Sequence, residues 1–198
     1  MAINTRTIAI DPGNENSGLI ILEGISIIGA YNLSNEALYS KISAYSIHPD
    51  LVIVVEDIKP YSLKLTPQVI DTCKFIGELN YRLKIAIGMN VKYVPRADVR
   101  RWVYDTFPAI CGPLIDLKIE KKMYDACSLE TMQEIRVNGN GGNKRKGSFI
   151  YIDDKMVMES MKDLYQLKKP APGKGYLYGL KDHSFQALAL GRYYMTKL

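Results

Sequence analysis

The chain has 198 residues, 47% of them apolar and 24% charged, with a formal net charge of +5 at pH 7. This length and apolar content suit a single α/β domain with a full core. There is no apolar run of about 18 residues and no signal-peptide pattern, which argues against a membrane or exported protein. Three widely spaced cysteines without a C-x-x-C pair argue against a disulfide framework and a zinc site. We therefore expect a soluble, cytoplasmic protein.

The first part of the chain predicts a meander of three strands. Residues 6–22 have the pattern strand, tight turn, strand, and the period of two places Ile8 and Ile10 on one face and Asp11 on the other. A Pro-Gly pair ends the first strand directly after Asp11. Residues 25–31 form the third strand. A lone Asp before Pro-Gly is more often a turn cap than a functional acid, so its role depends on the rest of the chain.

A second hydrophobic strand also ends in an acid. Ser34 is the expected N-cap of a helix over residues 36–45. Residues 51–55 are apolar without alternation, which predicts a central strand buried on both faces. Glu56 follows this strand directly, so two strands each deliver a carboxylate at their end.

The middle of the chain predicts helix, strand, helix. Thr66 and Pro67 begin a long helix that extends to residue 85, followed by a strand over residues 91–94 and a helix over residues 96–106. The long helix carries an apolar stripe at helical spacing, which suits both core packing and a dimer interface. The stripe comprises Val69, Ile70, Cys73, Ile76, Leu79 and Leu83.

The last part is less regular. Residues 108–152 are expected to be an insertion that builds no core, so the chain is a single domain, residues 1–198, interrupted there. Asp153 caps a helix that extends to about residue 167. Residues 178–195 form the closing helix, with Asp182 and His183 near its start.

The acids suggest a metal site. In a sheet of this connectivity the first and fourth strands are commonly neighbours, which would bring Asp11 and Glu56 together. Two clustered carboxylates raise each other's pKa unless a cation is shared between them, and Mg²⁺ is the cation that hard oxygen ligands favour. Two such ions could activate water and stabilise the leaving oxygen of a phosphodiester.

Three motifs in order resemble a known family: Ile8-Ala9-Ile10-Asp11-Pro12-Gly13-x-x-x-Ser17-Gly18, then Val54-Val55-Glu56-Asp57, then Asp182-His183-Ser184-Phe185-Gln186-Ala187-Leu188. Together they look like a RuvC-type Holliday-junction resolvase of the RNase H-like superfamily, in particular its phage-like branch. The resemblance covers about residues 6–105 and 150–195.

The resemblance implies an RNase H-like fold, with a five-stranded mixed sheet in order 3-2-1-4-5 flanked by helices. It also implies an endonuclease that nicks branched double-stranded DNA with Mg²⁺ or Mn²⁺, two ions per site. The protein would act as a homodimer in the cytoplasm of a bacterial or phage-infected cell. Asp11 and Glu56 match the family's first two carboxylates.

The last helix departs from the family's commonest pattern of two acids three residues apart. His183 and Gln186 occupy these positions, with Asp182 one residue upstream. Both Asp182 and His183 therefore remain candidates for catalysis and metal ligation. The missing acid also leaves open a catalytically weakened protein of this fold that binds branched DNA without cleaving it. A third alternative is an actin-like sugar kinase or ATPase, which also begins with an acid and a glycine turn. It would need a second phosphate-binding glycine hairpin and a longer chain, and the sequence has neither.

Basic residues are concentrated where DNA contact is expected. Residues 136–174 hold nine Lys or Arg against four Asp or Glu, which accounts for the whole net charge. Such a segment suits phosphate binding, although a solvated loop is the alternative. An aromatic side chain between two lysines after Glu56 could stack on an unpaired base at the crossover. The predicted DNA-binding residues are Lys59, Tyr61, Lys64, Lys144, Arg145, Lys146, Lys168, Lys169 and Lys174.

Overall fold

The computed structural model describes residues 6–45, 50–58, 66–86, 88–89, 91–114, 153–165 and 182–198. They contain one sheet of five strands in the order β3-β2-β1-β4-β5. β1 pairs antiparallel with β2 and parallel with β4, and β5 extends the parallel part. This confirms the expected RNase H-like mixed sheet in order 3-2-1-4-5. The strands are β1 (Arg6–Asp11), β2 (Asn16–Glu23), β3 (Ser26–Ser34), β4 (Leu51–Asp57) and β5 (Val91–Pro95).

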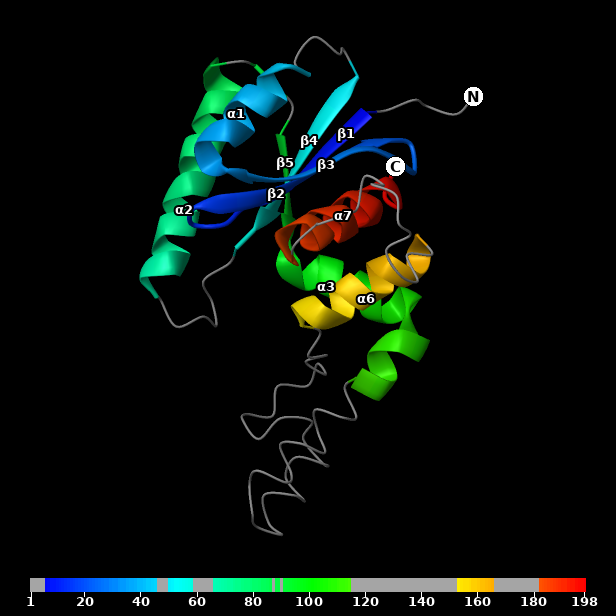
Figure 1. The fold of residues 1–198 in the computed structure, drawn as a ribbon. Coiled ribbons are helices and arrows are strands. Elements are labelled where there is room, and N and C mark those ends of the chain that lie inside the picture. The colour runs from blue at the N-terminus through cyan, green and yellow to red at the C-terminus, as the bar shows by residue number, and fades with distance from the viewer. Residues whose placement is uncertain are drawn as a thin grey trace, which may run out of the picture.

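Helices cover both faces of the sheet (Figure 1). α1 (Asn35–Ser43) and α2 (Pro67–Asn80) lie on one face, and α7 (Asp182–Met195) lies on the other, where α3 (Arg96–Thr106) and α6 (Asp154–Leu164) pack beside it. The sheet is therefore the middle layer of three. None of the helices in the described ranges is both long enough and apolar enough to cross a membrane.

The three predicted N-caps are confirmed. The side chains of Ser34, Thr66 and Asp153 each accept a hydrogen bond from the backbone N–H three residues later, at 3.3, 3.4 and 2.9 Å. Such a bond satisfies one of the free N–H groups at the start of a helix. The helix starts of α1, α2 and α6 are therefore encoded locally.

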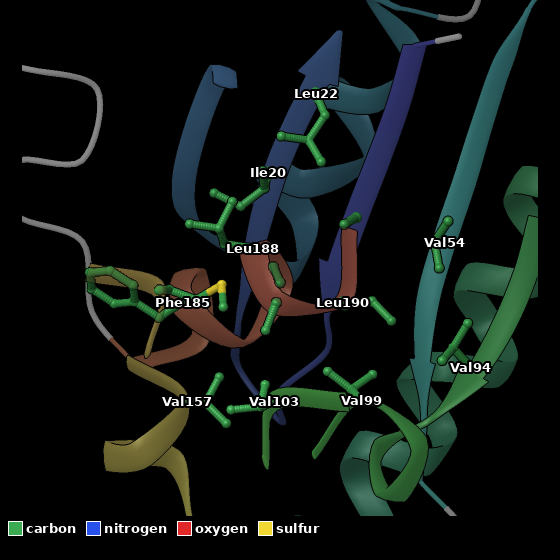
Figure 2. Close-up of a cluster of buried hydrophobic side chains, with 14 of the residues drawn as sticks. Ile20, Leu22, Val54, Val94, Val99, Val103, Val157, Phe185, Leu188 and Leu190 are labelled. Carbon is green, nitrogen blue, oxygen red and sulfur yellow. The ribbon is translucent and has the colours of Figure 1, made fainter. Parts of the chain in front are cut away.

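Strand alternation divides the core into two clusters. Ile8 and Ile10 face α1 and α2, whereas Ala9 faces α7. The central strand β4 is buried on both sides, as expected, because Ile53 and Val55 join the first cluster and Val54 the second. Figure 2 shows the second cluster, in which Leu188 of α7 lies toward Ile20 and Leu22 of β2, and Leu190 lies toward Val99 of α3. This packing holds α7 across the middle of the sheet.

The predicted apolar stripe of α2 is partly wrong. Its buried residues are Thr72, Phe75 and Leu79, followed by Leu83 in η2, a π-helical continuation over Tyr81–Ala86. Ile70 is 42% exposed and Cys73 is also exposed. Apolar residues lie on more than one side of this helix, so periodicity alone does not select the side that packs on the sheet.

Two further expectations need correction. The third strand begins at Ser26 and not at Ile25, which is in the turn and 66% exposed. Residues 108–114 are helical, and Cys111 is fully buried in the α3–α6–α7 cluster with its Sγ 3.8 Å from Ser160 Oγ. The expectation that no core is built after residue 107 is therefore wrong at its start. Residues 115–152 and the predicted first turn of the closing helix lie outside the described residues.

Candidate active site

Three parallel strands end at the same edge of the sheet. In the β1–β4 ladder Ile10 is opposite Val55, so Asp11 and Glu56 occupy the next position of the register. In the β4–β5 ladder Asp57 is opposite Pro95, and Arg96 follows directly as the first residue of α3. The carboxyl ends of parallel strands are where α/β proteins commonly bind ligands. The expected juxtaposition of Asp11 and Glu56 is thus observed, and Arg96 joins them.

The two carboxylates are buried and bridged by one guanidinium. The side chains of Asp11 and Glu56 are 1% and 2% exposed. Arg96 Nε donates to Glu56 Oε2 at 2.7 Å, and Arg96 Nη2 lies 2.5 Å from the same oxygen. Nη2 also donates to Asp11 Oδ1 at 3.1 Å. Arg96 therefore holds an oxygen of each carboxylate.

His183, near the start of α7, contacts the other oxygen of Asp11. Its Nδ1 lies 2.6 Å from Asp11 Oδ2. α7 can deliver the imidazole there because it passes directly over Gly18 of β2, where an added Cβ would collide with the His183 carbonyl oxygen. Ser184 anchors the same turn by donating to the Tyr31 carbonyl of β3 at 3.0 Å. The position of His183 thus depends on a glycine that admits close backbone approach.

The turn after Asp11 is fixed by side-chain hydrogen bonds. Asn35, the first residue of α1, donates from Nδ2 to the carbonyls of Gly13 and Asn14, each at 3.1 Å. Ser17 Oγ donates to Asn35 Oδ1 at 2.7 Å and accepts from Gly13 N at 3.3 Å. These bonds connect the turn to a helix and a strand, so Asp11 is held on a rigid support.

The electrostatics of the site follow from burial and proximity. Burial, and then the neighbouring charge of Asp11, raises the pKa of Glu56 to about 8 despite the opposing effect of Arg96. Burial alone would lower the pKa of the Arg96 guanidinium, but the charges of Glu56 and Asp11 outweigh it and raise this pKa. The hydrogen bond with Asp11 raises the pKa of His183. Burial thus favours the neutral form of Glu56, and the Arg96 guanidinium opposes this effect.

A second polar cluster lies beside the carboxylates. Gln186 is 4% exposed and donates to the backbone carbonyl of Asp154 at 3.3 Å, which connects α7 to the start of α6. The carboxylate of Asp154 accepts from Arg100 Nη2 at 2.6 Å. Gln186 thus serves a structural contact at the position where the resembled family commonly carries an acid.

The donor set suits a divalent cation in part. Asp11 and Glu56 offer adjoining carboxylate oxygens, the ligands that Mg²⁺ and Mn²⁺ prefer. Among the residues whose side chains are described, no group of three or more His, Cys, Asp or Glu is placed to hold an ion. Asp182 is the first residue of α7, but its side chain lies outside the described part of the chain. The two carboxylates therefore fit a cation, and the third ligand remains a prediction.

Arg96 is the site residue that the sequence interpretation missed. The sequence did contain a clue to it. Arg96 comes directly after the fifth strand, just as Asp11 and Glu56 lie at the ends of the first and fourth strands. The predicted DNA-binding residues all lie outside the described ranges, so their roles remain predictions: Lys59, Tyr61, Lys64, Lys144, Arg145, Lys146, Lys168, Lys169 and Lys174.

Comparison with known proteins gives structural similarities only. No protein-family model and no curated protein sequence matches the chain. The chain is similar to RuvC of T. thermophilus in complex with a Holliday junction substrate, with a TM-score of 0.49 and 10% identity, over 96% of this chain and 92% of that one. It is also similar to another Thermus thermophilus RuvC structure, with a TM-score of 0.44 and 14% identity, over 97% and 96%. The fold stated above follows from this chain's own strand order and register.

Proposed function

We propose that the protein is a metal-dependent, structure-selective endonuclease that nicks branched DNA such as Holliday junctions by phosphodiester hydrolysis. The observation that carries the proposal is the pair of buried carboxylates, Asp11 and Glu56, at adjoining strand ends of an RNase H-like sheet. Burying two acids side by side is costly unless a cation shares them. A site with this composition is therefore suited to holding Mg²⁺ or Mn²⁺.

The roles of the residues follow from their contacts. Asp11 and Glu56 would hold the metal, for which we propose two ions per site. When bound, the metal would activate a water molecule and stabilise the leaving oxygen. His183 uses Nδ1 to contact Asp11, so Nε2 is the ring nitrogen left to exchange a proton with water or the leaving oxygen. Asp182 is the alternative third metal ligand.

Branched DNA as the substrate is supported by the ordered sequence motifs that resemble RuvC-type resolvases. Paired nicks on one junction require two active sites, so we propose a homodimer. Ile70 and Cys73 on the outer side of α2 offer exposed apolar surface for it. The basic residues between 136 and 174 would contact the junction arms. The cytoplasm of a bacterial or phage-infected cell is the setting we propose.

A second candidate is a protein of the same fold that binds branched DNA without cleaving it. It is favoured by two contacts. Arg96 bridges both carboxylates, and Gln186, in place of an acid, donates a hydrogen bond to the Asp154 carbonyl. In that protein the cluster of Asp11, Glu56 and Arg96 would stabilise the fold and take no part in cleavage.

Cleavage and binding of a synthetic four-way junction separate the two candidates. With Mg²⁺ or Mn²⁺, the nuclease nicks the junction and leaves the matched linear duplex largely intact. Asp11→Asn and Glu56→Gln should each abolish nicking and leave the gel shift intact or stronger, because less negative charge repels the phosphates. A junction that is shifted but never nicked by the wild-type protein supports the binder, and nicking within a few-fold of wild type in either variant refutes the assigned site.

A further inference from the structure

Arg96 occupies the place between the two carboxylates. One nitrogen, Nη2, lies 3.1 Å from Asp11 Oδ1 and 2.5 Å from Glu56 Oε2. An ion that bridges the same oxygens must lie about 2.1 Å from each of them. A guanidinium nitrogen and a metal ion cannot share that space.

The other oxygen of Asp11 is also engaged. Asp11 Oδ2 lies 2.6 Å from His183 Nδ1. The two carboxylates are therefore already paired with side chains of the protein, and the Arg96 guanidinium is the cation between them. Such a buried pair loses stability when one partner is removed, because the other charges remain unpaired.

We propose that Arg96 is the resident counter-ion of Asp11 and Glu56, and that a divalent cation binds these carboxylates only by displacing the guanidinium. Arg96 is a positioning residue in this scheme, since it keeps the carboxylates aligned in the metal-free protein and sets how tightly a metal binds. The inference rests on the proposed function, because it concerns the same cation.

The Arg96 guanidinium is partly exposed and has a third carboxylate nearby. About a third of the Arg96 side chain is exposed, so it has a path away from the pair. Asp154 at the start of α6 contributes to the raised pKa of both Arg96 and His183, which places a third carboxylate within electrostatic reach. Asp154 already binds Arg100 at 2.6 Å and is half-exposed. A guanidinium that leaves Asp11 and Glu56 therefore remains near negative charge.

Metal affinity without DNA tests the proposal. When Mn²⁺ binding is measured by titration calorimetry, Arg96→Met should bind the ion at least tenfold more tightly than the wild-type protein, because the competing guanidinium is gone. In EDTA the same variant should melt about 2–4 °C lower, as expected when a partly exposed ion pair is removed from a chain of this size. Arg101→Met is the matched control: it removes one charge from an exposed position of the same helix, and should leave both quantities unchanged.

The outcomes are distinguishable. Suppose that Asp11→Asn abolishes Mn²⁺ binding, and that Arg96→Met binds Mn²⁺ no more tightly than the wild-type protein does. This result overturns the displacement and leaves the metal site intact. Absence of Mn²⁺ binding in every form contradicts the proposed metal function and the displacement with it. If Arg96→Met does not fold, the wild-type protein still gives a test by NMR. The Arg96 Nε–H, which donates to Glu56 at 2.7 Å, should lose its protection from solvent exchange as Mg²⁺ is added, and unchanged protection at saturating Mg²⁺ overturns the proposal.

Discussion

Replacing Glu56 by glutamine isolates the cost of burying two carboxylates side by side. The pKa of Glu56 is raised from 4.5 to about 8, so between these values the native state holds a proton that the unfolded chain has released. The free energy of unfolding therefore falls as the pH rises through this window. At about 1.4 kcal/mol per pKa unit the ceiling is about 5 kcal/mol. Relaxation and water entry reduce such penalties, so we expect a loss of about 2 kcal/mol between pH 5 and pH 8.

The assay is urea unfolding at pH 5, 6, 7 and 8 in EDTA, for the wild-type protein and Glu56→Gln. The difference between the two proteins cancels most other groups and should move by about 2 kcal/mol in favour of the variant across the series. His183 contributes a loss of the same sign in both proteins, because its raised pKa makes its stabilisation present below 6.5 and lost as the pH rises through its folded value. A difference that stays constant with pH would show that Arg96 keeps Glu56 ionised throughout, and would refute the reasoning.

Three other predictions concern α7, the loop after Glu56 and the basic segment. Gly18→Ala should lower the melting temperature and metal-dependent nicking together, since the new Cβ would collide with the His183 carbonyl oxygen; unchanged values would show that α7 does not depend on this close approach. Tyr61→Ala should slow junction cleavage more than it weakens binding, because base stacking is worth about 1–3 kcal/mol, and equal activity removes Tyr61 from the mechanism. Alanine at residues 144–146 should lower the log–log salt slope of junction binding by up to about 0.9 for each phosphate that the variant no longer neutralises, without changing the cleavage site. A wild-type slope would show that this loop does not bind DNA.

Local signals in the sequence were sufficient for most of the framework. Apolar runs that end in an acid defined β1 and β4, and Ser34, Thr66 and Asp153 defined helix starts, because capping needs only a few neighbouring residues. The strand order required more, since the sequence pattern left the sheet edges open and the family resemblance supplied order 3-2-1-4-5.

Tertiary contacts account for what the sequence did not predict. Arg96 is one of several arginines near its position in the chain, and only the β4–β5 register brings it to Glu56. Likewise, the buried side of α2 was predicted only in part. Leu79 and Leu83 are buried as expected, but Phe75 packs into the core against Tyr39 of α1, whereas Ile70 is exposed. Both errors concern choices that packing makes among chemically similar residues.

The central claim is that the edge formed by Asp11 and Glu56 holds a divalent cation. Crystals grown with Mn²⁺ and diffraction data collected at the manganese absorption edge test it directly. The account predicts an anomalous peak within bonding distance of both carboxylates, with Arg96 turned away from them and either His183 or Asp182 as a further ligand. Saturating Mn²⁺ with no peak at this edge, and Arg96 still bridging Asp11 and Glu56, would contradict it.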